Sequence, residues 1–130
     1  MITDRISYII TRIKNAVTIK HEILIFSFTK ISLSIFRIFK KEGFIKDFKI
    51  SPNNKKLIIL LKYEKISNKP MFKKIKQISK PSLRTYMSSN KLSKLLDHNG
   101  ITLLSTSKGI LTNKRAKELH LGGEILCYIW

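Results

Sequence analysis

The chain has 130 residues, a length that suits one compact unit or two very small ones. Its 26 Lys and Arg residues stand against only 8 Asp and Glu, and a net charge of +18 on so small a body calls for an anionic partner, either nucleic acid or an anionic membrane. Disorder is excluded because 43% of the residues are hydrophobic and recur with helix and strand periods, and a membrane span because the longest apolar run covers only residues 57–61.

The first predicted element is a helix with one apolar and one basic side. Thr3 or Asp4 can cap its N-terminus, and apolar residues then follow at helical spacing: Ile6, Ile9, Ile10, Ile13 and Val17. On the opposite side lies a basic, hydrogen-bonding ridge made of Arg5, Tyr8, Arg12 and Asn15. The ridge is either a solvated surface or an RNA contact, and with the high net charge we weigh the two interpretations equally.

A short strand and a second helix come next. Leu24, Phe26 and Phe28 alternate with Ile25 and Ser27, and Thr29 then stands where a helix N-cap belongs. The second helix has a predicted stripe of Ile31, Ile35, Ile38 and Phe39 and ends at Gly43. Leu33 and Phe36 lie off this stripe, so we expect them to be exposed, as ordinary surface residues or as a patch against a neighbouring protein.

Two strands complete the first half. Residues 44–50 and 56–63 have strand patterns, and the Pro and Asn residues between them suit a hairpin loop. The segment 64–70 lacks periodicity and contains Ser67, Asn68 and Pro70, which is typical of a linker. We therefore predict two domains, residues 1–66 with the order α-β-α-β-β and residues 67–130, with the boundary near residue 67.

Strand patterns dominate the second half. A turn at residues 79–82 leads into a strand at 83–87, Asn90 can cap a short helix that stops before Gly100, and residues 101–104 form the next strand. A brief helical turn runs from Thr112 or Asn113 to Leu119, and a last strand follows Gly122 and ends at Trp130. The predicted class is α+β, with a mostly-β C-terminal domain that contains a short helix.

The sequence motifs give little support to a catalytic site or a metal site. Residues 105–108 fit a Ser-x-x-Lys pattern, but the companion motifs of penicillin-recognising enzymes are missing. His21, His98 and His120 stand alone without the spacing of metal ligands, and Cys127 lies in an apolar strand, where a buried thiol is expected. We predict no enzyme activity, no metal site, no cofactor and no small-molecule substrate.

A polar run near the C-terminus is the best candidate for RNA contact. Ser105, Thr106 and Ser107 supply hydroxyls for base edges and 2′-OH groups, Lys108 supplies a charge for a phosphate, and Gly109 allows close backbone approach. From these residues alone, a simple loop is equally well supported.

Two further groups are supporting candidates. Arg84 and Tyr86 alternate on one strand, where they can flank or stack on nucleotides, although Tyr86 can equally belong to the core. Gly122, Gly123 and Glu124 can bring a carboxylate to an amino group of a base, or Glu124 can merely orient basic neighbours.

Several motifs in order resemble the bacterial and organellar form of the eighth small-subunit ribosomal protein, over essentially the whole chain. They are residues 11–16 (TRIKNA), 41–45 (KEGFI), 78–81 (ISKP) with Leu83 and Arg84, 105–109 (STSKG) and 122–128 (GGEILCY). One departure is Ser82, which stands where such proteins usually have Gly, so the turn there can differ locally.

The resemblance implies a two-domain α+β protein that binds the central domain of the small-subunit ribosomal RNA and helps to organise the platform, next to other small-subunit proteins. It implies that residues 105–109 grip an irregular RNA helix, supported by residues 122–124, and that the first helix looks toward RNA. A skew of 22 Ile and 21 Lys against 2 Ala indicates AT-rich coding, which is common in organellar and some bacterial genomes. Together with the resemblance, we expect a plastid stroma ribosome, with the bacterial cytoplasm as the alternative. The alternative is a basic module outside the ribosome that binds nucleic acid or a membrane surface.

Overall fold

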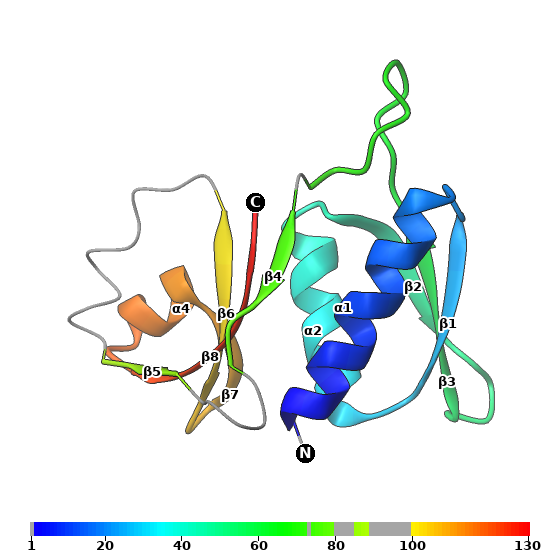
Figure 1. Cartoon of the computed structure of the whole chain (residues 1–130). Coiled ribbons are helices and arrows are strands. Elements are labelled where there is room, and N and C mark those ends of the chain that lie inside the picture. The colour runs from blue at the N-terminus through cyan, green and yellow to red at the C-terminus, as the bar shows by residue number, and fades with distance from the viewer. Residues whose placement is uncertain (1, 73, 80–84, 89–99) are drawn as a thin grey trace. The chain divides into compact units, whose positions relative to one another are not determined.

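A computed structural model describes residues 2–72, 74–79, 85–88 and 100–130 of the chain, with the side chains of residues 2–4 left aside (Figure 1). Contacts between Cα atoms divide the chain into two compact units, one of residues 11–73 and one of residues 1–10 together with 74–130. The domain boundary near residue 67 stays a prediction.

The unit of residues 11–73 has the expected α-β-α-β-β order. It contains the C-terminal part of α1 (Ile2–Thr18), then β1 (Ile23–Ser27), α2 (Lys30–Lys41), β2 (Ile45–Ile50) and β3 (Lys56–Leu61). The three strands form one antiparallel sheet in the order β1-β3-β2 (Figure 1). The hairpin between β2 and β3 is confirmed, and β3 ends at Leu61 rather than at Tyr63, which instead forms an isolated bridge with Pro70.

The apolar stripe of α1 is largely confirmed. Ile6, Ile9, Ile10 and Ile13 are buried, and α1 begins at Ile2, before the predicted cap. Further along the helix Ala16 is buried while Val17 is only half-buried. At 100° per residue Val17 lies nearer the centre of the predicted stripe than Ala16 does, so ideal helical spacing does not account for this difference.

The two ends of α2 are capped as the sequence predicts. The hydroxyl of Thr29 accepts a hydrogen bond from the backbone N–H of Ser32 at 3.0 Å, so Thr29 is the N-cap. At the other end Gly43 has φ +82, its N–H donates to the carbonyl of Lys40, and the N–H of Phe44 donates to the carbonyl of Phe39. This pair of bonds is a Schellman motif, in which glycine is favoured because the backbone there has a positive φ.

The prediction that Phe36 is exposed was wrong. Its exposed fraction is 0%, and its ring centroid lies 5.1 Å from that of Phe26 on β1 and 5.8 Å from that of Phe39. The buried stripe of α2 is Ser32, Ile35, Phe36 and Phe39, so it is rotated relative to the predicted one, and Ile31, Leu33 and Ile38 are half-buried. The ring of Phe36 fills more core volume than the side chain of Ile31 or Ile38 would. Its burial sets which side of α2 faces the sheet.

The second unit is built around one long strand. β8 (Gly123–Ile129) pairs with β4 (Ile75–Gln77), with β5 (Tyr86–Met87) and with β6 (Ile101–Thr106), and β6 pairs with β7 (Gly109–Thr112), all antiparallel. β4 extends the sheet just before the predicted turn at residues 79–82. The short helix at residues 90–99, the turn at 80–82 and Arg84 lie outside the described residues.

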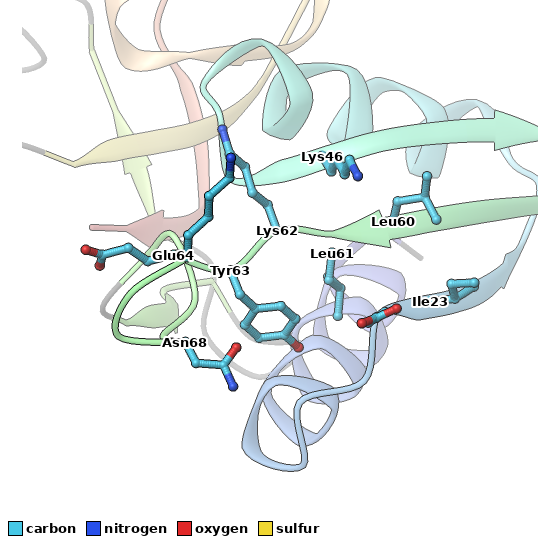
Figure 2. Close-up of a pocket in the computed structure, with 10 residues that line it drawn as sticks. Ile23, Lys46, Leu60, Leu61, Lys62, Tyr63, Glu64 and Asn68 are labelled. Carbon is cyan, nitrogen blue, oxygen red and sulfur yellow. The ribbon is translucent and has the colours of Figure 1, made fainter.

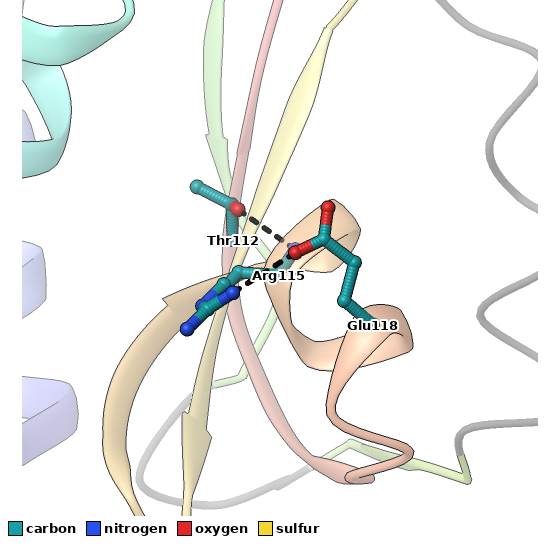
Figure 3. Close-up of polar contacts among 3 residues, drawn as sticks. All are labelled: Thr112, Arg115 and Glu118. Atoms are coloured by element: carbon teal, nitrogen blue, oxygen red, sulfur yellow. Dashed lines mark hydrogen bonds and ion pairs between the residues drawn. The ribbon is translucent and has the colours of Figure 1, made fainter.

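The short helix α4 (Asn113–Glu118) covers part of this sheet. Thr112 is its N-cap, accepting a hydrogen bond from the N–H of Arg115 at 3.2 Å, and Arg115 forms an ion pair with Glu118 at 3.0 Å (Figure 3). Ala116 of α4 packs with Leu104 and Ile125 in the core. Cys127 is buried as expected, and burial raises the pKa of its thiol to about 12. Nowhere in the described ranges is a helix both long and apolar enough to cross a membrane.

Candidate nucleic-acid interface

The polar run at residues 105–109 is the end of a β-hairpin. Ser105 and Thr106 are the last residues of β6, Gly109 is the first residue of β7, and Thr106 pairs with Gly109. Ser107 and Lys108 are therefore the two loop residues of a tight turn. Gly109 has φ +102, a conformation that residues with a Cβ rarely adopt.

The hydroxyls of this hairpin have different surroundings. The Thr106 hydroxyl donates to the carbonyl of Gly109 at 2.8 Å and accepts from the N–H of Lys108 at 3.2 Å, so it holds the turn. Ser107 and Lys108 are exposed at the tip, whereas Ser105 is half-buried in the sheet. The turn therefore presents one hydroxyl and one ammonium group to the surroundings on a rigid support.

Glu124 lies between two other candidate residues. On β8 it pairs directly with Ser105 of β6 and with Tyr86 of β5. Residues paired directly across strands project to the same side of a sheet, so the three side chains form one row, which we call the glutamate row. Along the chain, Glu124 is 19 positions from Ser105 and 38 positions from Tyr86.

The members of the glutamate row differ in exposure, because Ser105 and Glu124 are half-buried whereas Tyr86 is exposed. Tyr86 is 66% exposed, so of its two interpretations the surface one holds and the core one does not. Atom Oε1 of Glu124 is buried and has no hydrogen-bond partner among the described residues. A buried acceptor without a partner costs free energy, and a donor brought by a ligand would remove that cost.

The fold leaves no room for a side chain at position 123, which is occupied by glycine. A Cβ atom built on it would lie 2.3 Å from the carbonyl oxygen of Ser105 and 3.2 Å from Cγ2 of Thr106. β8 therefore approaches β6 more closely than a side chain would allow, directly beside Glu124. Gly122 is exposed just before the strand.

Ser79, which the sequence pattern did not indicate as a site residue, helps to hold the strand that carries Tyr86 of the glutamate row. Ser79 is fully buried, and its hydroxyl accepts from the N–H of Thr85 at 2.9 Å. The carbonyl of Thr85 in turn accepts from the N–H of Ile125 at 2.8 Å. These bonds fix the start of β5, and so the position of Tyr86. A serine in a turn segment gives no sequence signal for such a role.

Comparison with known proteins shows to which family the chain belongs. The model of the family described as Ribosomal protein S8 matches residues 4–130. The chain belongs to the ribosomal protein S8 family. It is 51% identical to the small ribosomal subunit protein uS8c of Phaeodactylum tricornutum and 52% identical to that of Trieres chinensis, over the full length of both chains in each case. It is 42% identical to the small ribosomal subunit protein uS8 of Synechocystis over 98% of both chains.

Membership confirms the resemblance seen in the sequence. The chain is a structural component of the small ribosomal subunit and acts in translation, and its family is not enzymatic. In the part of the chain that the structure describes, no group of three or more His, Cys, Asp and Glu side chains is placed to hold a metal ion.

Three of the four residues of the predicted ridge on α1 are exposed, and Arg12 is half-buried. Arg5, Tyr8 and Asn15 are exposed on the helix. Arg12 instead contacts β1, because one of its guanidinium nitrogens donates to the carbonyl of Ile25 and its Cζ lies 4.5 Å from the centroid of the Phe26 ring. The sequence did not indicate this contact, which depends on how α1 packs against the sheet.

Proposed function

We propose that this S8-family chain binds the central domain of the small-subunit ribosomal RNA through the tip of the β6–β7 hairpin and the glutamate row. The observation that carries the proposal is the direct pairing of Glu124 with Ser105 and Tyr86, beside the exposed Ser107 and Lys108. Gly123 supports this contact by letting β8 lie close to β6, and Gly122, exposed just before the strand, stays a proposed member of the site on sequence grounds. Arg84 stays a proposed member of the site on sequence grounds.

The chemistry of the site favours an irregular or opened RNA region. A carboxylate repels phosphates but accepts from the amino groups of guanine or cytosine, so Glu124 reads a base edge. The exposed ring of Tyr86 offers a surface on which an unstacked base can lie. Ser107 reaches a base or a 2′-OH, and Lys108 meets a phosphate. In a regular RNA double helix the major groove is too deep and narrow for side chains to read, and the bases stay stacked, so Tyr86 would have no base to stack on.

The basic surface supplies the remaining affinity. With 26 basic and 8 acidic residues, phosphate contacts from many lysines add binding that depends on salt but not on sequence. Arg5 and Asn15 on α1 are exposed and form a second proposed contact, whereas Arg12 adds charge from a position held against β1.

We further propose that the ribosome in question is that of a plastid. The relatives at 51% and 52% identity carry the uS8c name, and the bacterial relative from Synechocystis is less similar at 42%. As part of this proposal, the chain helps to organise the platform during assembly of the small subunit. Its further partners are neighbouring small-subunit proteins.

The test is a titration of the full chain with two RNAs of equal length at matched salt. One is the central-domain segment of a plastid small-subunit RNA and the other is an unrelated structured RNA. We expect tight binding of the first and at least 10-fold weaker binding of the second, since specific sites exceed non-specific binding by far more than that at a well-formed interface. Equal affinity at several salt concentrations would overturn the proposal and leave a basic module without a preferred RNA.

A further inference from the structure

The sheet of the unit 11–73 has a second side, away from α2, and that side is apolar. β1 and β3 alternate, so that Leu24, Phe26, Leu57 and Ile59 face the core. The other positions pair Ile23 with Leu60 and Ile25 with Ile58, which makes a block of four aliphatic side chains. We call this block the aliphatic face. Ile23 is 53% exposed, Ile25 is 47% exposed, and Ile58 and Leu60 are half-buried.

A hollow of about 460 Å³ opens at one end of this face (Figure 2). Ile23 and Leu60 lie in its wall, and the ring of Tyr63 stands on the other side of Leu61, its hydroxyl donating to the carbonyl of His21 at 2.6 Å. Lys46 and Lys62 also line it, together with Glu22. The hollow is therefore lined by apolar and charged side chains together, a combination that is common in protein interfaces.

The composition of this surface argues against RNA as its occupant. Isoleucine and leucine side chains cannot stack on bases as aromatic rings or guanidinium groups do. Lys46, Lys62 and Lys65 outnumber Glu22 and Glu64 in the wall of the hollow, so its charge suits an anionic group of either kind and the apolar side chains decide against RNA. A second copy of the chain is disfavoured as well, because two bodies of charge +18 repel each other.

What fits is a protein segment that combines aliphatic and acidic side chains. Its aliphatic groups would bury the exposed parts of Ile23 and Ile25, and its carboxylates would meet Lys46 and Lys62. On the far side of the face Ile58 pairs with Lys49 of β2, which adds a third exposed cation for the same segment.

We propose that the aliphatic face, with the hollow at its end, docks a neighbouring small-subunit protein through a segment in which aliphatic residues stand next to Asp or Glu. This proposal rests on membership of the small subunit and is independent of the proposed RNA contact. The surface lies within residues 22–68, whereas the glutamate row and the hairpin lie within residues 86–124.

The test places a photo-crosslinking amino acid at Ile25 of the full chain, which is then assembled into small subunits and irradiated. Mass spectrometry of the crosslinked product should show a peptide of another small-subunit protein with Asp or Glu within a few residues of the crosslinked aliphatic side chain. A crosslink to RNA, a crosslink to a second copy of the chain, or no protein crosslink would each overturn the proposal.

Charge reversal provides a matched pair of variants in the crosslinking chain. Lys62→Glu should lower the yield of the protein crosslink about 5-fold or more, since a like charge at an interface disfavours the encounter and the complex. Lys55→Glu makes the same charge change on an exposed lysine in the loop between β2 and β3, at the opposite end of β3, and should leave the yield unchanged. Equal losses for the two variants would overturn the proposed docking.

RNA titration of the same variants separates this proposal from the proposed function. Lys62→Glu and Lys55→Glu should weaken binding of the central-domain RNA to the same small extent, through net charge alone. A selective loss with Lys62→Glu would make the surface an RNA site and overturn the protein proposal. Failure of the wild-type chain to prefer that RNA would count against the proposed function only.

Discussion

Gly123 and Ser105 lie so close together that a Cβ atom on Gly123 would be 2.3 Å from the carbonyl oxygen of Ser105. The contact is between backbone atoms of β8 and β6, so no side-chain rotation can relieve it. Directly next to it, Glu124 pairs with Ser105 across the same two strands. The glycine therefore sets the strand spacing on which the position of the glutamate row depends.

Gly123→Ala should accordingly reduce both stability and RNA selectivity. Pushing the two backbones apart should lower the free energy of unfolding by about 1–3 kcal/mol, as overpacking in a core does. It should also move Glu124 away from Ser105 and reduce the preference for the central-domain RNA. Denaturant unfolding and RNA titration measure the two effects.

Gly43→Ala is the control for a loss of stability alone. Gly43 has φ +82 with nothing within 4 Å of a Cβ atom, so the variant should lose about 1–2 kcal/mol through backbone strain. Because Gly43 lies in the other unit, RNA selectivity should be retained. An equal loss of selectivity in both variants would show that stability, and not strand spacing, explains the Gly123 effect.

Ser107→Ala tests the exposed hydroxyl at the tip of the hairpin. The variant should weaken binding of the central-domain RNA by about 1–3 kcal/mol, as expected when a hydrogen bond in an interface is lost and its partner is left unpaired. Binding of unrelated RNA should be unchanged, since the charge is unchanged. Ser27→Ala, on an exposed serine of β1, is the matched control. An unchanged affinity for Ser107→Ala would remove this serine from the proposed site.

Much of this fold follows from local patterns, and the site follows only in part. Helix and strand periods gave the α-β-α-β-β order, and Thr29 and Gly43 bounded α2 correctly because capping depends on near neighbours. The residue types at 105–109 indicated a polar contact, because Ser, Thr, Lys and Gly are chemically distinctive. None of these inferences needs knowledge of distant parts of the chain.

The remaining features depend on register and packing. The glutamate row joins three strands that are far apart in the sequence, and no local pattern fixes how they align. Phe36 was misplaced because α2 has two overlapping apolar stripes, and only packing against Phe26 selects one. The contact of Arg12 with β1 likewise exists only in the folded unit.

Arg12→Ala should therefore act chiefly on stability. Its guanidinium donates to the carbonyl of Ile25 on β1, a strand at the end of the sheet order, and lies over the Phe26 ring. Loss of the charged hydrogen bond and of the cation–π contact should lower the free energy of unfolding by about 1–3 kcal/mol. Lys14→Ala, on an exposed lysine of the same helix, is the control for lost charge.

RNA titration of the same pair separates structure from contact. We expect the two variants to lose similar, small amounts of affinity at low salt, because each removes one positive charge. If Arg12→Ala loses RNA affinity far beyond Lys14→Ala while its unfolding curve is unchanged, Arg12 is an RNA contact after all.

The corrected stripe of α2 predicts which of two apolar residues matters. Phe36→Ala should lower the free energy of unfolding by about 3–5 kcal/mol, because it leaves a cavity beside Phe26 and Phe39. Leu33→Ala, at a half-buried position, should cost clearly less. Urea unfolding of both variants is the measurement, and similar losses would mean that the predicted rather than the observed stripe faces the core. Should Phe36→Ala not fold, Phe36→Leu, with an expected smaller loss, keeps the comparison with Leu33.

Glu124→Gln separates a base-reading carboxylate from one that only orients its neighbours. Gln keeps the shape of the side chain and an acceptor oxygen but removes the charge, so a charge-assisted hydrogen bond to a base amino group becomes a neutral one. The expected loss of central-domain RNA affinity is about 1 kcal/mol, roughly 5-fold, which is the difference between the two kinds of bond. Binding of unrelated RNA should tighten slightly, because one negative charge near the phosphates is gone. Glu118→Gln, on an exposed carboxylate paired with Arg115, removes the same charge away from the row and should raise the affinity for both RNAs alike (Figure 3). Titrations of the two variants at three salt concentrations decide the matter: parallel gains in affinity for both RNAs with Glu124→Gln would exclude a base contact by this glutamate.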